Sequence, residues 1–160
     1  MTRFIVLAVF TFVGQQAAIA APVTTKGPTA LALAAVIAQH SPLVRAFDKR
    51  IIARLFNGRT NFGFTPNKKI SVTADSVVCR TSNVDITSRT CDLSFGVRKH
   101  ALTGREANEV SATGLTAGAS SDGAAGSIVE SISKLECAID PNEIMKKDSG
   151  GAECTFETGQ

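Results

Sequence analysis

Four cysteines constrain this chain more than any other feature, because each lies in a strand-like segment beyond an apolar N-terminus. Cys79, Cys91, Cys137 and Cys154 all fall on the apolar side of an alternating pattern. Their successive hairpin spacings of 12 and 17 positions lack the C-x-x-C arrangement of a zinc site. An even number of cysteines in an exported chain of modest length favours disulfides. We therefore predict two structural disulfides and no metal site.

Four cysteines allow three pairings, and the sequence leaves all three open. We favour Cys79–Cys91 and Cys137–Cys154, because each pair would join neighbouring strands of one hairpin, where facing Cα atoms are within bonding reach. The other two pairings would join the first half of the chain to the second.

The first 20 residues have the three parts of a secretory signal peptide. Arg3 is the positive start, residues 4–13 are the apolar run, and an A-I-A signal ends at Ala20. We predict cleavage after Ala20, a flexible leader over residues 21–27, and a single disulfide-bonded α+β domain over residues 28–160. No later segment has 18 successive apolar residues, so we predict no integral membrane segment after cleavage and an exported protein, periplasmic or extracellular.

Two helices are predicted at the start of the domain. One begins with Pro28 and is rich in Ala and Leu, and the second covers residues 42–57, with Ser41 as its N-cap. The second helix has an apolar stripe that recurs every four residues: Leu43, Phe47, Ile51 and Leu55. We predict that this stripe packs in the core while the cations opposite face water. The alternative is a helix that lies on an anionic membrane.

Strand-like alternation follows in two parts of the chain. The first part runs from Ile70 to Cys79, with a bulge near Asp75, and continues from Cys91 to Val97. The second part contains Cys137 and Cys154, on either side of a break at Asp140-Pro141-Asn142.

Two further helices are predicted between these parts. One opens at Thr103 with the spacing of a capping box, and the other is capped by Asp122 and carries Ile128, Ile132 and Leu135 at helical spacing. The expected order is α-α-β-β-α-α-β-β. We predict a single α+β domain with a roughly four-stranded antiparallel sheet covered by helices and stapled by the two disulfides.

Charge is divided unevenly along the chain. Residues 21–105 contain 13 Lys or Arg against 4 Asp or Glu, whereas residues 106–160 contain 3 against 10. Two interpretations are open: a bipolar surface that steers a charged partner, or two halves that pair within one fold. We favour the second interpretation, because a single domain brings both halves together.

Residue types that carry common chemistry are scarce. There is no Trp or Tyr, which argues against surfaces that stack on nucleobases, and we predict no nucleic-acid partner. The two histidines, His40 and His100, are remote from any recognised nucleophile motif, and no phosphate-binding or dinucleotide-binding loop is present. We predict no catalytic residues, no cofactor and no enzymatic activity.

Three functions follow from these observations as hypotheses. The leading one is a non-enzymatic binding or inhibitor-like module, with an unknown protein partner, that presents the hairpin loops at residues 80–90 and 140–151. The alternative is an envelope-associated structural protein that adsorbs through the basic helix at residues 42–57. The third is a small hydrolase, which would require a cleft joining His100 to a Ser or an acidic residue.

Overall fold

The computed structural model describes most of the predicted domain. The predicted signal peptide and its cleavage site lie outside the described residues, as do parts of both hairpin loops. The described ranges are residues 22–63, 66–82, 89–115, 121–124, 127–146 and 150–158.

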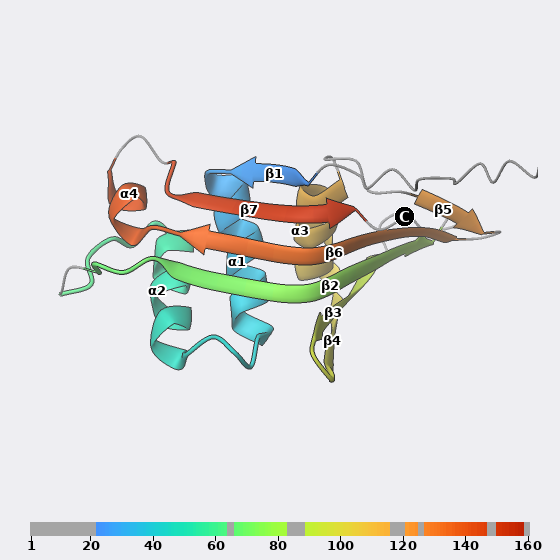
Figure 1. The fold of residues 1–160 in the computed structure, drawn as a ribbon, viewed down its shortest axis with the longest axis horizontal. Helices are drawn as coiled ribbons and strands as arrows, with labels where there is room; N and C mark the ends of the chain where they lie inside the picture. The colour runs from blue at the N-terminus through green and yellow to red at the C-terminus, as the bar shows by residue number, and fades with distance from the viewer. Residues whose placement is uncertain are drawn as a thin grey trace, which may run out of the picture.

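Within the described ranges, seven strands form one antiparallel sheet, and four helices accompany it (Figure 1). Six strands lie in the order β1-β7-β6-β2-β3-β4, and the short β5 pairs with one end of β6. In chain order the elements are β1 (Val23–Lys26), α1 (Pro28–His40), α2 (Ala46–Phe56), β2 (Ile70–Ser82), β3 (Arg89–Phe95), β4 (Arg98–Thr103), α3 (Gly104–Leu115), β5 (Ser121–Ala124), β6 (Ser127–Ile139), α4 (Pro141–Met145) and β7 (Ala152–Thr158).

The predicted α+β class and antiparallel sheet are confirmed, but the predicted four strands and the predicted order of elements are wrong. The leader does not remain free along its whole length, because β1 pairs with β7. Val23 and Thr25 are partly buried and Thr24 and Lys26 are exposed, which is the alternation of a short edge strand. Lys26 also forms an ion pair of 3.5 Å with Glu153.

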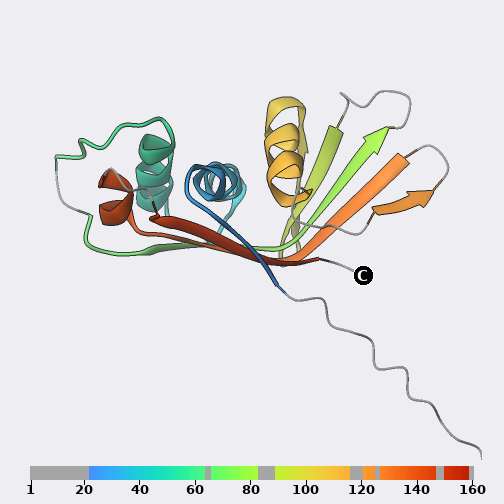
Figure 2. The same ribbon diagram turned by 90° about the horizontal axis from the view of Figure 1, so that it is seen from above.

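The helices cover one face of a strongly bent sheet, with α1 and α3 on its concave side (Figure 2). The core lies between α1 and the sheet, where Leu33 and Ile37 of α1 and Phe156 of β7 are fully buried. α2 packs mainly on α1 rather than on the sheet. The outer side of α2 is therefore left facing away from the core.

The bend coincides with a matched shift in the two central strands. In β2 the buried positions change parity between Ala74 and Val77, and in β6 they change parity between Ile132 and Leu135. These four residues face one another in register across the two strands. The intervening Lys134 has a φ of 58°, in the left-handed region, and β6 also changes register with β7 there.

This shift explains why the helix predicted after Asp122 is wrong. Ile132 and Leu135 both face the core although they are three positions apart, which imitates helical spacing in a strand. The segment from Ser127 to Ile139 is a long central strand, held on one side by β2 and on the other by β7 and β5. Tertiary pairing overrides the local pattern here.

Both disulfides join facing residues of neighbouring strands, as we favoured from the sequence. Cys79 of β2 is bonded to Cys91 of β3, and Cys137 of β6 is bonded to Cys154 of β7. The four cysteines are buried. The two bonds therefore clamp the sheet on both sides of its central β2–β6 pair.

The α2 helix is shorter than predicted, and its apolar stripe is divided. It begins at Ala46 instead of residue 42, because the Ser41 hydroxyl accepts a hydrogen bond of 3.2 Å from the Leu43 backbone and holds a turn there. Ile51 and Leu55 are buried as expected. Leu43 and Phe47 are exposed, so the prediction that the whole stripe packs in the core is wrong for these two residues.

This division predicts unequal effects of two substitutions on stability. Ile51→Ala should lower the free energy of unfolding by about 2 to 5 kcal/mol, because Ile51 is only 5% exposed. Phe47→Ala should lower it by about 1 kcal/mol, because roughly half of the ring is already in water. Urea unfolding followed by circular dichroism measures both. Equal losses would contradict the described packing of α2.

Candidate functional site

Exposed apolar side chains gather where α1 ends and α2 begins. Leu43, in the turn between the helices, is 72% exposed, and Phe47, in the first turn of α2, is 47% exposed. The Ser41 side chain that shapes this turn is itself buried, so the turn is anchored to the protein. The two apolar groups are therefore presented to solvent by a fixed segment.

A third exposed apolar side chain comes from a different part of the chain. Val97 was expected to extend the strand that ends at Phe95, but it lies in the two-residue turn between β3 and β4 and is fully exposed. Gly96 has a φ of 60°, which such a tight turn requires, and its backbone N–H donates to the Asp75 carboxylate. This turn is thus held to β2.

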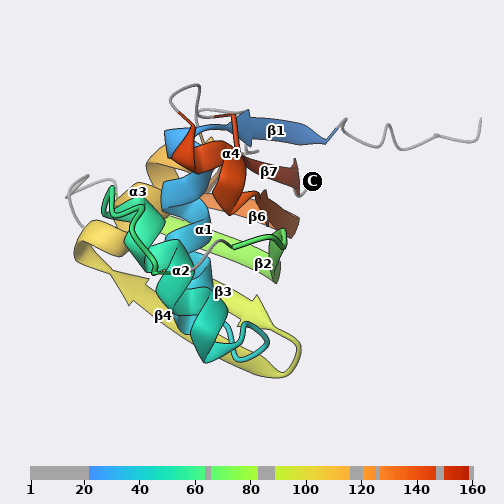
Figure 3. The same cartoon turned by 90° about the vertical axis from the view of Figure 1, so that its left-hand side faces the viewer.

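The two histidines place these segments side by side. The rings of His40 and His100 stack with centroids 3.9 Å apart and an angle of 20° between their planes. His40 Nε2 also lies 3.2 Å from a carboxylate oxygen of Glu106 at the start of α3. Leu43 follows His40 by three residues and Val97 precedes His100 by three, so both lie in the segments that the stack links. The α1–α2 turn and the β3–β4 turn lie on the same side of the molecule (Figures 1 and 3).

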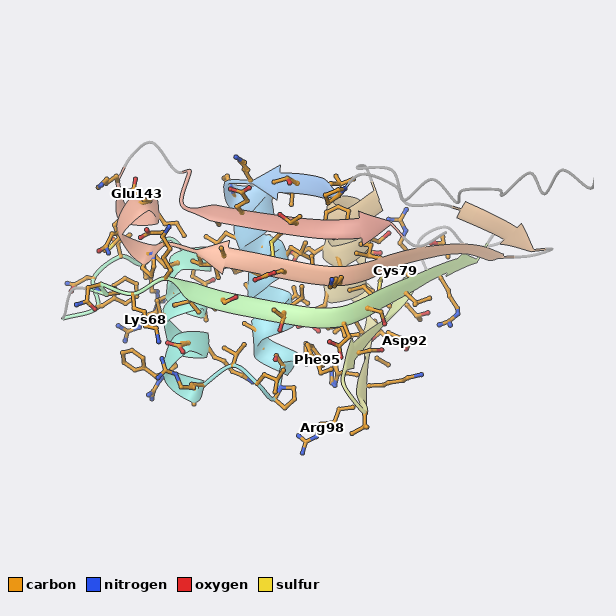
Figure 4. All side chains as sticks on the ribbon, in the orientation of Figure 1. Lys68, Cys79, Asp92, Phe95, Arg98 and Glu143 are labelled. Carbon is orange, nitrogen blue, oxygen red and sulfur yellow. A yellow bond between two sulfur atoms is a disulfide. The ribbon has the colours of Figure 1, made fainter. Side chains whose placement is uncertain are left out.

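Cations lie beside these apolar side chains in two places, which Figure 4 shows well apart at Lys68 and Arg98. Lys68 lines a hollow beside Phe47, and Arg98 and Lys99 follow Val97 at the hairpin tip, from which Arg98 projects in Figure 4. Within the described part of the chain, these three cations form no hydrogen bond or ion pair. We call this surface the basic end; it consists of Leu43, Arg45, Phe47, Lys68, Val97, Arg98 and Lys99.

Arg45 differs from the other cations of the basic end because it has an acidic neighbour. Its guanidinium donates a hydrogen bond of 2.8 Å to Asp48, and this carboxylate raises the pKa of Arg45. Arg45 therefore stays charged, but its charge is compensated locally. The net positive charge of the basic end comes from the unpaired lysines and from Arg98.

Acidic residues lie at the opposite edge of the molecule. Asp140 is the N-cap of α4, Glu143 lies in α4 and Glu153 lies in β7. Figure 1 shows α4 and β7 toward the upper edge of the sheet, whereas the α1–α2 turn lies at the bottom of the view. The described ion pairs do little to join the two halves of the chain. Lys26–Glu153 is the only described pair between a lysine or arginine of the first half and a carboxylate on another element of the second half. The described ion pairs therefore give the interpretation of paired halves little support beyond the Lys26–Glu153 contact.

The two hairpin loops predicted as a binding surface show fewer features of a binding site among the described residues. The loop at residues 140–151 is largely taken up by α4, which Asp140 caps by accepting from the Asn142 and Glu143 backbones. Gly151 closes it, and a Cβ there would lie 2.7 Å from the Ile144 nitrogen. In the loop at residues 80–90, residues 83–88 lie outside the described part.

The histidines bring no nucleophile with them among the described residues. Neither His40 nor His100 is hydrogen-bonded to a serine there, and all four cysteines are in disulfides. Groups of three His, Cys, Asp or Glu residues placed to hold a metal are not found in the described ranges. None of the described helices is both long and apolar enough to cross a bilayer.

Comparisons with protein-family models, curated proteins and solved structures found no match to this chain. The functional argument therefore rests on the surface itself. Sequence reasoning identified the basic helix but missed the exposure of Leu43 and Val97. Ser41-Pro42 and Gly96 were the available signals, because each marks a turn next to an apolar residue.

Proposed function

We propose that the protein is a non-enzymatic, exported binding module that adsorbs to an anionic membrane surface through its basic end. This proposal rests on three apolar side chains, Leu43, Phe47 and Val97, that are exposed on the two segments linked by the histidine stack. Lys68 beside Phe47, and Arg98 and Lys99 beside Val97, form no ion pair with any described residue. A partner for this surface must offer both an apolar phase and negative charge. An anionic lipid membrane offers an apolar interior and negatively charged head groups across the whole basic end.

The energetics suit reversible adsorption. A fully buried Leu, Phe or Val side chain contributes about 1.5 to 3 kcal/mol, and each Lys or Arg near an anionic surface contributes about 1 kcal/mol. Phe47 contributes less than the full amount, because about half of its surface is already covered. Neither the apolar nor the charged contribution is large alone, so both together would be needed for stable binding.

Export supports the same proposal. Two disulfides are compatible with an oxidising compartment, and the N-terminal segment has the pattern of a signal peptide. Such a protein would meet the outer leaflet or the periplasmic surface of the envelope. The inhibitor-like hypothesis, which places a protein partner at residues 80–90 and 140–151, has no described surface of comparable character.

Sedimentation with lipid vesicles tests the proposal. The purified mature chain should sediment with vesicles that contain phosphatidylglycerol and not with vesicles of phosphatidylcholine alone. High salt should weaken this binding, because it screens the attraction of the unpaired cations. Equal sedimentation with both vesicle types, or none with either, would contradict adsorption to an anionic surface.

A further inference from the structure

A separate groove lies on the helical side of the molecule. It has a volume of about 560 Å³ and runs between α2 and α3, with α1 at its base. Figure 2 shows these three helices side by side above the sheet, with α1 in the middle. The apolar part of the lining is Ala35 and Val36 of α1 together with Ala53 and Phe56 of α2. This volume lies within the range of small-molecule sites.

The charges along the two walls are not equally compensated. On the α3 wall, Glu109 accepts from Arg105 at 3.1 Å, and Glu106 lies 3.2 Å from His40 Nε2. On the α2 wall, the Lys49 ammonium donates only to the Gln39 carbonyl, at 3.0 Å, and Arg50 has no hydrogen bond or ion pair in the described part of the chain. The α2 wall therefore carries two cations that no carboxylate of the described residues neutralises.

We infer that this groove binds a small amphiphile that has an apolar body and one anionic group, a carboxylate or a phosphate. The body would cover Ala35, Ala53 and Phe56, and the anionic group would bind Arg50 and Lys49. Arginine presents several donors in a planar fork that suits both anions. This site is distinct from the basic end and does not depend on adsorption to a membrane.

Four probes that share a ten-carbon chain separate the contributions to binding. Decanoate and decyl phosphate carry the two candidate anions, decanol is neutral, and decyltrimethylammonium is cationic. Titrations of the mature chain by nuclear magnetic resonance, with each probe as a monomer, should show both anions bound and decanol bound at least about tenfold more weakly. The cationic probe should not bind. A preference between the two anions identifies the head group.

Two variants test the residues, each with a matched control. Arg50→Gln should weaken binding of the anionic probes by roughly tenfold, whereas Arg54→Gln, which removes the same charge one turn further along α2, should not. Ala53→Trp should block the groove, and circular dichroism checks that the variant is folded. Leu43→Ser with Phe47→Ser should leave probe binding unchanged.

The inference fails if decanol binds as well as decanoate, or if Arg50→Gln and Arg54→Gln have equal effects. It also fails if the probes shift the resonances of Leu43 and Phe47 and not those of Ala53. That last result would assign the binding to the basic end and would leave the proposed membrane adsorption intact.

Discussion

Replacing Leu43, Phe47 and Val97 together by serine should weaken binding to anionic vesicles by at least about a hundredfold. Each substitution removes an apolar side chain that would enter the lipid, and a combined loss of about 3 kcal/mol or more corresponds to that factor. Because Leu43 and Val97 are mostly exposed and Phe47 is about half exposed, the melting temperature should fall by only several degrees. Vesicle titration and thermal unfolding of the same preparation measure the two quantities.

Phe56→Ser is a suitable control, because Phe56 is also partly exposed but lies at the other end of α2, outside the basic end. It should leave vesicle binding unchanged. A companion variant with Lys68, Arg98 and Lys99 changed to glutamine should lose binding and also most of its salt dependence. If the serine variant binds as well as the parent, the exposed apolar residues have another role.

Replacing all four cysteines by alanine should leave the chain largely unfolded at physiological temperature. Each disulfide closes a short loop, of 12 or 17 positions, and contributes about 3 kcal/mol in the chain-entropy account. A loss of about 6 kcal/mol is comparable to the whole stability of many domains of this size. Far-ultraviolet circular dichroism and the dispersion of amide resonances report the outcome.

The two cysteine pairs should also be replaced separately. Each double variant should remain folded, with its urea midpoint lowered. A quadruple variant that unfolds cooperatively at the parent's midpoint would show that the disulfides add little to stability. In that case the stability of the fold would come from the buried contacts of α1 with the sheet.

Local patterns predicted the parts of this fold that local physics controls. Pro28 correctly marked the start of α1, and the alternation around Cys79 and Cys91 correctly indicated paired strands. The failures have a different origin. The spacing of Ile132 and Leu135 imitates a helix only because Lys134 interrupts the alternation of a strand, and that interruption is matched in a partner strand far along the chain.

The candidate site was less predictable for a similar reason. The cations of residues 42–57 were visible in the sequence, but the exposure of Phe47 depends on where α1 leaves α2 uncovered. The link between the segments that carry Leu43 and Val97 depends on the contact between His40 and His100. A pattern within one segment does not encode contacts of this kind.

The stacked histidines have a consequence for how the protein would stand on a membrane. Leu43, Phe47 and Val97 do not lie along one helix, so they define a plane rather than a line, and the His40–His100 contact links the two segments that carry them. A protein held on a membrane by three side chains that are not in one line cannot rotate freely relative to the membrane plane. The edge with α4 and β7 would then face the aqueous phase in one fixed orientation, accessible to soluble molecules.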